Sequence, residues 1–389
     1  MDKQVGNVQL MQKMNRLKVL DFVRHNRDVS RPSIAEHTGL SLASITNITT
    51  YLFNRGLLYE SGTEQVGRVG RKSTLLRFCA ERYNLICVYI REQYIHIAYT
   101  DLEGTPLESV RIGTEGLSFT NVTEELQAAV KTIVDLHDKS RILGIGVAIS
   151  GLVLSDSRLV LSSGLKWKSV DIRELITAVV DLPVFVDNVS MLKAAWHFSQ
   201  KRTNNLENAI FVDMENGISA VQYVNGEIAH STLGKIGHTT VESDGVECFC
   251  GNHGCLEAMC SPERVLSLYE QYAGKPAESL SEVDKLCRYE DEAAVKAIEE
   301  CGKYLGIGLA NLISLFNPSM LVIDTGDFEE CSTLLLTAER ELHRRTYPAL
   351  TKKLLIRQVN EFKDNILCGM AFNLCDRLFN ISFPDNIVE

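Results

Sequence analysis

The residues best suited to bind a metal ion are three cysteines and a histidine between Gly234 and Ser261. Cys248, Cys250 and Cys255 follow the spacing C-x-C-x4-C, and His238 lies ten residues before the first of them. Three thiolates and one imidazole form a closed tetrahedral set for zinc, with no position open for a catalytic water. Free buried thiols and a disulfide are the alternatives, but the short spacings and the intervening glycines favour a metal. The pattern predicts a structural zinc site.

Composition places this loop in an ordinary globular protein. The 389 residues are 45% hydrophobic and 23% charged, enough for two or three domains with a sizeable core. We find no apolar run of membrane-spanning length and no signal-peptide pattern at the N-terminus. The 11 cysteines fit no secreted disulfide framework in a chain of this length. We therefore expect a cytoplasmic protein without membrane insertion.

Charge is distributed unevenly along the chain. Residues 1–80 contain 12 Lys and Arg against 6 Asp and Glu, a formal charge of +6, whereas the remainder has 28 basic and 44 acidic residues, a charge of −16. A basic N-terminal module on an acidic body suggests that the N-terminal part alone meets an anionic polymer.

Two helices are predicted in the first 40 residues. Apolar residues recur at helical spacing over residues 15–26. In the next helix Ser30 is placed to cap the N-terminus, Pro32 lies in the first turn, and Gly39 ends the helix.

A third helix, Leu42–Arg55, follows after a short turn, with Ile45, Ile48 and Leu52 facing inward. Helix, glycine-containing turn and helix form a helix-turn-helix unit, whose second helix enters the major groove of DNA. The outward positions are small and polar, as contact with base edges and phosphates requires. The residues expected to meet DNA in this unit are Arg31, Ser41, Ala43, Ser44, Thr46, Asn47 and Thr50.

A two-stranded wing is predicted after the third helix, from Leu57–Gly62 and Arg71–Phe78. Arg68, Arg71 and Lys72 at its tip lie between or beside glycines, and such a segment can insert arginine into a narrow minor groove. The alternative is a protein-interaction module with a solvated basic loop. Helix order, wing and local charge together favour a winged helix-turn-helix DNA-binding domain over residues 1–80.

The pattern of residues 81–389 predicts an α/β body with two halves. Strands are predicted at 83–90 and 94–99, with the approach to a third at 109–112. A long amphipathic helix and the buried strand Ile142–Ile149 follow. Further strands, which alternate with helices, are predicted at 184–187, 209–213, 220–224 and 320–324.

From about residue 15 to its C-terminus the chain resembles the ROK family, which contains repressors and sugar kinases. The resemblance implies a two-lobed, actin-like fold with a ligand in the cleft between the lobes, and oligomers that are dimers or tetramers. The motifs that carry the resemblance are Gly144–Gly151, Leu165–Trp167, Asp187–Asn188, Gly237–Glu257 and Asn311–Pro318.

The chain departs from the family's kinases at the segments that hold ATP. The glycine-containing phosphate loop of the kinases is replaced by Tyr89–Tyr94, which has no glycine. The second and third nucleotide segments correspond to Glu215–Ala220 and Asp324–Asp327, where few of the expected glycines are present. The position of the general base, an Asp in the kinases, is Val189, which accepts no proton. These departures argue against an enzyme.

The resemblance implies that part of the sugar site is kept. Asn188, His238 and Glu257 correspond to residues that contact sugar hydroxyls, His238 with one ring nitrogen while the other binds zinc. Gly151 completes the expected ligand set. Lys235 stands where the family has Glu, and is predicted to meet an anionic group of the ligand, to pair with Asp187, or to be solvated. Glu257 has an alternative role as an acceptor for N–H groups of the zinc loop.

The sequence therefore predicts a repressor of carbohydrate genes that binds operator double-stranded DNA and responds to a sugar or sugar derivative. One alternative is a ligand-independent regulator controlled by a protein partner, and the other is an ATP-dependent sugar kinase. The charge pattern favours a DNA-binding regulator, and the departures at the nucleotide segments argue against the kinase. Asn188, His238 and Glu257 favour a regulator that responds to a ligand over one controlled by a protein partner alone.

Overall fold

The structure, a computed structural model, describes residues 2–64, 73–154, 158–162, 165–200, 206, 208–215, 217–229, 233–328, 331–360 and 365–381. By contacts the chain divides into two compact units. Unit 1 comprises residues 1–149, 171–187 and 367–389, and unit 2 comprises residues 150–170 and 188–366. Each is described separately.

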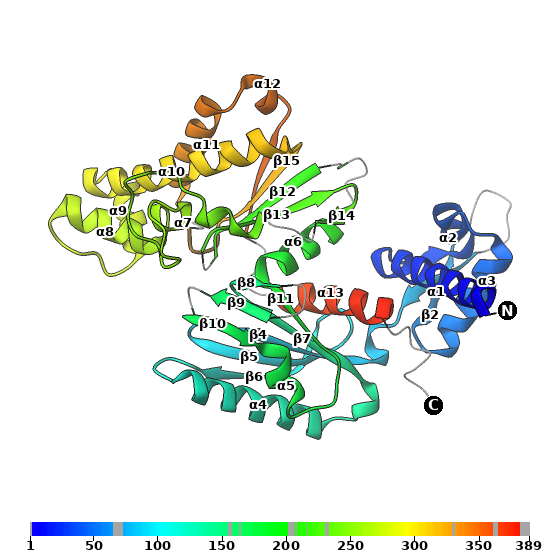
Figure 1. Ribbon diagram of the computed structural model, residues 1–389. Helices are drawn as coiled ribbons and strands as arrows, with labels where there is room; N and C mark the ends of the chain where they lie inside the picture. The colour runs from blue at the N-terminus through cyan, green and yellow to red at the C-terminus, as the bar shows by residue number, and fades with distance from the viewer. Residues whose placement is uncertain are drawn as a thin grey trace. The chain divides into compact units, whose positions relative to one another are not determined.

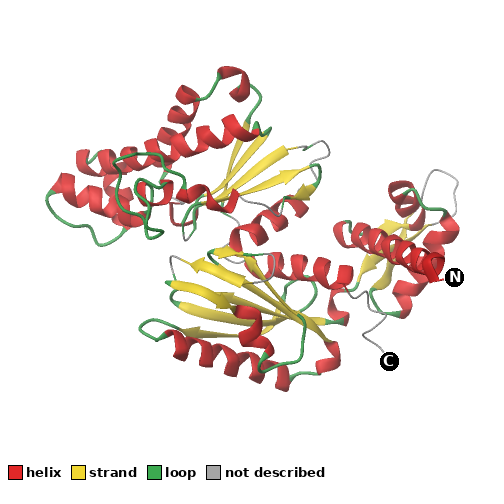
Figure 2. Ribbon diagram, in the orientation of Figure 1, coloured by secondary structure: helices red, strands yellow, loops and turns green. Residues whose placement is uncertain are grey.

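Unit 1 begins with three helices and a small sheet (Figures 1 and 2). Ser30 and Ser33 form a capping box at the start of α2, and Gly39 ends that helix with a φ of 71°. The sheet has the order β1-β3-β2, so the two wing strands pair next to a short third strand. The elements are α1 (Asp2–His25), β1 (Val29–Ser30), α2 (Arg31–Thr38), α3 (Leu42–Asn54), β2 (Leu58–Glu64) and β3 (Ser73–Phe78).

Two details of this module differ from the sequence prediction. α1 begins at Asp2, well before the predicted start at residue 15. In α3 the buried side chains are Ile45, Thr49 and Leu52, whereas Ile48 is half-buried. Thr49 tolerates burial because its hydroxyl donates to the carbonyl of Thr46 and accepts from Arg31 Nε.

The rest of unit 1 is a five-stranded sheet of order β11-β7-β4-β5-β6. Figure 1 shows α4 and α5 on one face of the sheet and α13 on the other. Gly144 and Gly146 of β7 let α13 approach, since a Cβ at Gly144 would lie 3.2 Å from Leu378 and a Cβ at Gly146 would lie 3.3 Å from Leu374. The elements are β4 (Asn84–Ile90), β5 (Tyr94–Thr100), β6 (Pro106–Gly113), α4 (Phe119–Leu136), β7 (Ile142–Ile149), α5 (Ile172–Thr177), β11 (Val184–Asn188) and α13 (Ile366–Ile381).

Unit 2 contains a second five-stranded sheet, of order β14-β13-β12-β15-β16, and a small sheet of order β10-β9-β8. Alternate residues of β12 face opposite sides: Ile210 and Val212 pack with the helices that follow the metal loop, and Ala209 and Phe211 pack with α6. Strand elements are β8 (Leu152–Val153), β9 (Arg158–Ser162), β10 (Trp167–Asp171), β12 (Asn208–Asp213), β13 (Ser219–Val224), β14 (Glu227–Ile228), β15 (Met320–Asp324) and β16 (Leu355–Val359). Helices are α6 (Val189–Gln200), α7 (Leu256–Met259), α8 (Pro262–Ala273), α9 (Leu280–Arg288), α10 (Glu292–Phe316), α11 (Ser332–Arg345) and α12 (Pro348–Thr351).

The two large sheets share a topology. In each sheet, three consecutive strands form an antiparallel meander, and a later strand pairs in parallel with the first of them. The parallel pairs are β4 with β7 and β12 with β15. This repeat accounts for the two halves predicted from the sequence. None of the helices in the described ranges combines the length and apolar character that a membrane span needs.

Candidate functional site

The predicted metal ligands come together in unit 2. One ligand atom from each of His238, Cys248, Cys250 and Cys255 lies within 4.8 Å of all the others. The Sγ atoms of Cys250 and Cys255 are 3.7 Å apart. Two sulfurs bound to one zinc at about 2.3 Å in tetrahedral geometry lie about 3.8 Å apart, whereas disulfide sulfurs lie about 2.05 Å apart. The cluster therefore has the dimensions of a metal site rather than a disulfide.

Glycines fold the loop around this cluster, as the sequence predicted. Gly251 has a φ of 93° and donates its N–H to the carbonyl of Cys248. At Gly254, whose φ is 65°, a Cβ would lie 1.6 Å from the carbonyl oxygen of Glu242, so no other residue fits. Cys260, which is 1% exposed, packs in the core and is not part of the cluster.

The ring of His238 is oriented by the cluster. Its Nδ1 lies 3.6 Å from Cys248 Sγ, so Nδ1 is the ring nitrogen beside the predicted metal ligands. Nε2 is then the nitrogen left for the predicted contact with a sugar hydroxyl. His238 ends a short 3-10 helix, η3 (Leu233–His238), that also carries Lys235, whose side chain is exposed.

Asn188 and Gly151, both expected to bind ligand, are in direct contact. Asn188 Nδ2 donates to the Gly151 carbonyl at 2.6 Å, and its Oδ1 accepts from the N–H of Ser190 at 2.8 Å. One N–H and one lone pair of this amide remain for further hydrogen bonds. Asn188 thus joins the segment after β7 to the start of α6 and keeps the capacity to hold a hydroxyl group.

Glu257 is positioned by α7, which begins directly after Cys255. Its Oε2 accepts from the N–H of Ile218 at 3.1 Å, between β12 and β13. Ile218 lies outside the metal loop, so this hydrogen bond differs from the alternative predicted from the sequence, in which Glu257 accepts from N–H groups of that loop. A Cβ at Gly217 would lie 2.5 Å from this oxygen, so the glycine allows the close approach.

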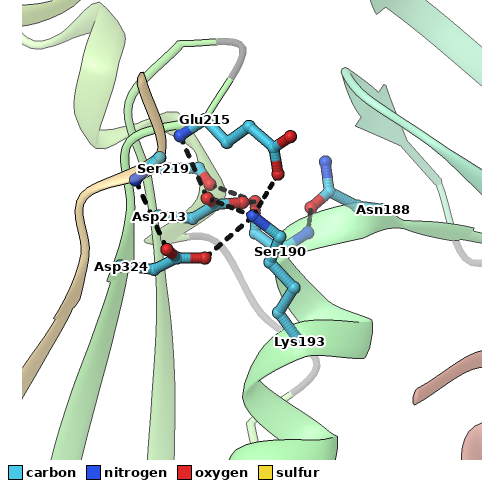
Figure 3. A network of polar contacts seen from close by, with 8 residues as sticks. Asn188, Ser190, Lys193, Asp213, Glu215, Ser219 and Asp324 are labelled. Carbon is cyan, nitrogen blue, oxygen red and sulfur yellow. Dashed lines mark hydrogen bonds and ion pairs between the residues drawn. The ribbon is translucent and has the colours of Figure 1, made fainter. Parts of the chain in front are cut away.

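A buried cluster of charged groups lies beside these residues (Figure 3). Lys193 of α6 is 1% exposed, and its Nζ lies 2.9 Å from Asp213, 2.9 Å from Asp324 and 2.6 Å from Glu215. Asp213 and Asp324 end the neighbouring parallel strands β12 and β15, where they are in register. Ser190 donates its hydroxyl to Asp213 Oδ2, which ties this cluster to the segment that begins at Asn188.

Burial and charge shift the pKa values in this cluster. Burial raises the pKa of Asp324 to about 6, although Lys193 opposes the shift. Burial disfavours the ammonium of Lys193, but the surrounding carboxylates outweigh it and hold its pKa above the usual value. Lys193 is therefore a permanent internal cation at physiological pH.

Sequence reasoning missed Lys193, although two signals were available. Both predicted strands end in Asp, at 213 and 324, and carboxyl ends of neighbouring parallel strands meet at one edge of a sheet. Lys193 lies between Leu192 and Ala194 in an otherwise apolar helical segment. A lysine on a buried helix face requires an acidic partner.

The N-terminal module exposes most of the residues expected to meet DNA. On α3 the side chains of Ala43, Thr46, Asn47 and Thr50 are exposed, and Ser44 is half-buried. Ser41 is the N-cap and accepts from the N–H of Ser44. Arg31 is half-buried against Thr49. The wing-tip residues Arg68, Arg71 and Lys72 lie outside the described residues.

Helix α1 adds residues that sequence reasoning missed. Arg16 stacks on Tyr51 of α3, its guanidinium carbon 3.8 Å from the ring centroid. A depression of about 260 Å³ lies between α1 and α3 and joins Arg16 to Ser44 and Asn47. The exposed face of α3 is therefore continuous with a basic group of α1.

Helix α13 connects two parts of unit 1. Its Asp376 binds Arg24 of α1 at 2.5 Å, and Arg24 also donates to the carbonyl of Phe372. Asn373 and Arg377 of the same helix donate to Asp187, at the end of β11. One helix thus holds both the N-terminal module and the residue that precedes Asn188.

Comparison with known proteins identifies the family of this chain. Residues 85–374 match the sequence profile of the ROK family. The chain belongs to the ROK family. It is 27% identical to the xylose repressor of Caldicellulosiruptor bescii over 98% of this chain and 100% of that protein. It is 28% identical to the DNA-binding transcriptional dual regulator NagC of Escherichia coli K12, over 86% of each chain.

Solved structures of the ROK family have the same fold. A ROK family transcriptional regulator, a homologue of the E. coli Mlc protein, superposes with a TM-score of 0.80 at 23% identity, over 95% of this chain and 98% of that one. A ROK glucokinase from Streptomyces griseus, solved with glucose and AMPPNP, superposes with a TM-score of 0.61 at 20% identity, over 75% of this chain and 98% of that one. The fold alone therefore fits regulators and kinases.

Proposed function

We propose that this protein is a cytoplasmic transcriptional repressor of carbohydrate genes, released from its operator by a sugar or sugar derivative. The observation that carries the proposal is the N-terminal module, in which α3 exposes a polar face beside Arg16 and β2 and β3 form a wing. Relatives named as repressors match the chain over nearly its full length, this module included.

In this proposal residues 1–80 bind DNA, and residues 81–389 bind the effector and form a dimer or tetramer. Two copies of the module would contact two operator half-sites. The effector would act by binding one arrangement of the protein better than another, and tenfold release of DNA needs about 1.4 kcal/mol of such coupling. Within unit 1, α13 provides a physical connection, because it holds Asp187 and Arg24 at the same time.

The effector site would consist of Gly151, Asn188, His238 and Glu257, with Lys235 near an anionic group of the ligand. Its support is geometric: Asn188 contacts Gly151, and the Nδ1 of His238 faces the cysteines. Zinc is the metal that three cysteines and one histidine select. It would hold the ring of His238 and the start of α7, which carries Glu257.

A kinase reaction is not part of the proposal. Val189 is 2% exposed at the start of α6 and has no group to take a proton. A coupled assay for ADP formation across a sugar panel tests this directly, and clear turnover would contradict the proposed function.

DNA binding is tested with fluorescence anisotropy on fragments upstream of the protein's own gene and its neighbours. We expect salt-dependent binding that Asn47→Ala weakens and that Leu355→Ala, an exposed residue on β16, leaves unchanged. Equal affinity for every fragment and every variant would contradict operator recognition.

Effector binding is tested by thermal shift with neutral sugars, sugar acids and sugar phosphates. A compound that raises the melting temperature is expected to weaken DNA binding as well. Specific DNA binding with no shift from any compound would replace the effector with control by a protein partner.

A further inference from the structure

The buried lysine in unit 2 lies among three carboxylates. Its Nζ lies 2.6 to 2.9 Å from three carboxylates, two of them on residues that are at most 1% exposed. Asp213 further accepts from the hydroxyl of Ser190 and the N–H of Glu215, which are neutral donors. One ammonium thus faces the carboxylates of Asp213, Glu215 and Asp324 in a nearly water-free place, and a divalent cation interacts with such a group of carboxylates more strongly than a monovalent one does.

The position of the cluster is also informative. It lies at the ends of β12 and β15, beside the two segments that correspond to nucleotide segments in the ROK kinases. These segments adjoin, since a Cβ at Gly326 would lie 2.7 Å from the backbone of Glu215. N–H groups of the first segment are taken up by carboxylates of this chain: Asp213 accepts from Glu215 and Glu257 accepts from Ile218. Donors that would suit a phosphate are thus already bonded.

We propose that Lys193 is a tethered cation that occupies a divalent-metal site formed by Asp213, Glu215 and Asp324. Carboxylate oxygens at the ends of neighbouring strands are the ligands that hard divalent cations prefer. The ammonium fills their common centre and excludes a metal ion, together with any phosphate that such an ion would bring. A substitution that removes the Lys193 side chain leaves an empty space among the three carboxylates, and this space is a site for a divalent metal ion. This inference goes beyond the proposed function and does not depend on DNA or effector binding.

The test compares two substitutions of Lys193 by titration with Mn²⁺, followed by electron paramagnetic resonance and melting temperature on protein saturated with zinc. Lys193→Ala removes the charge and leaves room for an ion, whereas Lys193→Met removes the charge and fills the space. We expect one additional Mn²⁺ per chain in the Ala variant, bound at least about tenfold more tightly than by the parent protein, and addition of Mn²⁺ should raise the melting temperature of this variant. The Met variant and the parent protein should take up no such ion, and addition of Mn²⁺ should leave their melting temperatures unchanged.

A second substitution identifies the ligands. Asp213→Asn in the Lys193→Ala background is expected to abolish the added Mn²⁺ site. If the Ala variant does not fold by itself, its refolding yield is measured with and without Mn²⁺, and the proposal requires that the metal restore it. A Lys193→Ala protein that binds no more Mn²⁺ than the parent, or refolds equally without it, would overturn the proposal. Equal responses of the Ala and Met variants would do so too.

Discussion

Two clusters in unit 2 bring like groups close together. Around His238 the groups are three thiols, and around Lys193 they are three carboxylates. The carboxylate cluster contains its cation within the chain, on α6. The thiol cluster consists entirely of groups that bind metals, so the cation of the proposed zinc site would come from solution.

The two clusters therefore differ in what their geometry depends on: the carboxylate cluster depends on the chain alone, and the thiol cluster is expected to depend on a bound metal ion. The carboxylates lie at strand ends in the sheet, and the ammonium that balances them is always present. The thiols lie on a loop outside both large sheets, where the backbone pairs through isolated bridges, Thr240 with Cys255 and Glu247 with His253, and through hydrogen bonds of turns. We therefore expect metal supply to control the loop that carries His238 while the sheet below it keeps its geometry.

The largest expected effect is at the thiol cluster. Cys250→Ala should eliminate stoichiometric zinc, because three ligands remain of a set whose apparent binding free energy is about 10 kcal/mol or more in small zinc domains. Metal content by mass spectrometry under native conditions is the measurement. Cys260→Ala, in a buried residue just after α7, should keep one zinc per chain. Zinc retained at one per chain by Cys250→Ala would contradict the ligand set.

Loss of the internal cation should come next. Lys193→Met leaves three carboxylates in a buried place without their partner, and breaking a buried ion pair in this way costs about 3–5 kcal/mol. Urea unfolding at neutral pH measures the loss. Lys352→Met removes a lysine that is exposed after α12 and should change stability little. A loss below about 1 kcal/mol for Lys193→Met would show that the carboxylates do not need the ammonium.

The carboxylate cluster should also give stability a pH dependence. Asp324 has a pKa of about 6 in the folded chain, above its ordinary value, so the folded state holds this proton more tightly than the unfolded state does. Its contribution to stability is therefore present at low pH and is lost as pH rises from about 4 to about 6, by about 3 kcal/mol at most. Lys193 and Asp213 are the charged groups that face it.

Asp324→Asn should flatten this part of the stability profile, measured by urea unfolding at several pH values. Asp135 is a control of opposite sign, because hydrogen bonds from Lys131 and Lys139 hold its pKa at about 2. Its contribution is present above its ordinary pKa and is lost as pH falls toward 2. If the free energy of unfolding changes with pH in the same way for Asp324→Asn and the parent protein, Asp324 is not the source of this pH dependence.

The sequence predicted the parts of the fold that local patterns determine. Capping by Ser30, the glycine at 39 and the strand ends at Asp213 and Asp324 are all present. The metal ligands were predicted because their chemistry is carried by spacing within one loop. The pairing of Lys193 with carboxylates 20 and 131 residues away was not predicted, because it depends on which strands become neighbours. The role of α13 was missed for the same reason, since Arg24 and Asp376 are 352 residues apart.

Glu257 links the helix after the metal loop to the segment between β12 and β13, and its substitution should have the smallest effect on stability. It follows Cys255 by two residues, and its carboxylate accepts from Ile218 in the segment that leads from Glu215 back into the sheet. Glu257→Gln keeps an acceptor for that N–H, so we expect a change of less than about 1 kcal/mol and full zinc content. Glu257→Ala leaves the N–H without this acceptor and should cost about 1–3 kcal/mol.

The two variants separate support of the backbone from contact with an effector. If Glu257 only supports Ile218, Glu257→Gln should respond like the parent protein to any sugar that shifts its melting temperature. If the carboxylate also binds hydroxyl groups of that sugar, the Gln variant should lose most of the shift while its stability and zinc stay unchanged, because an amide accepts these bonds less strongly than an anion. The second result is the one that the proposed function predicts.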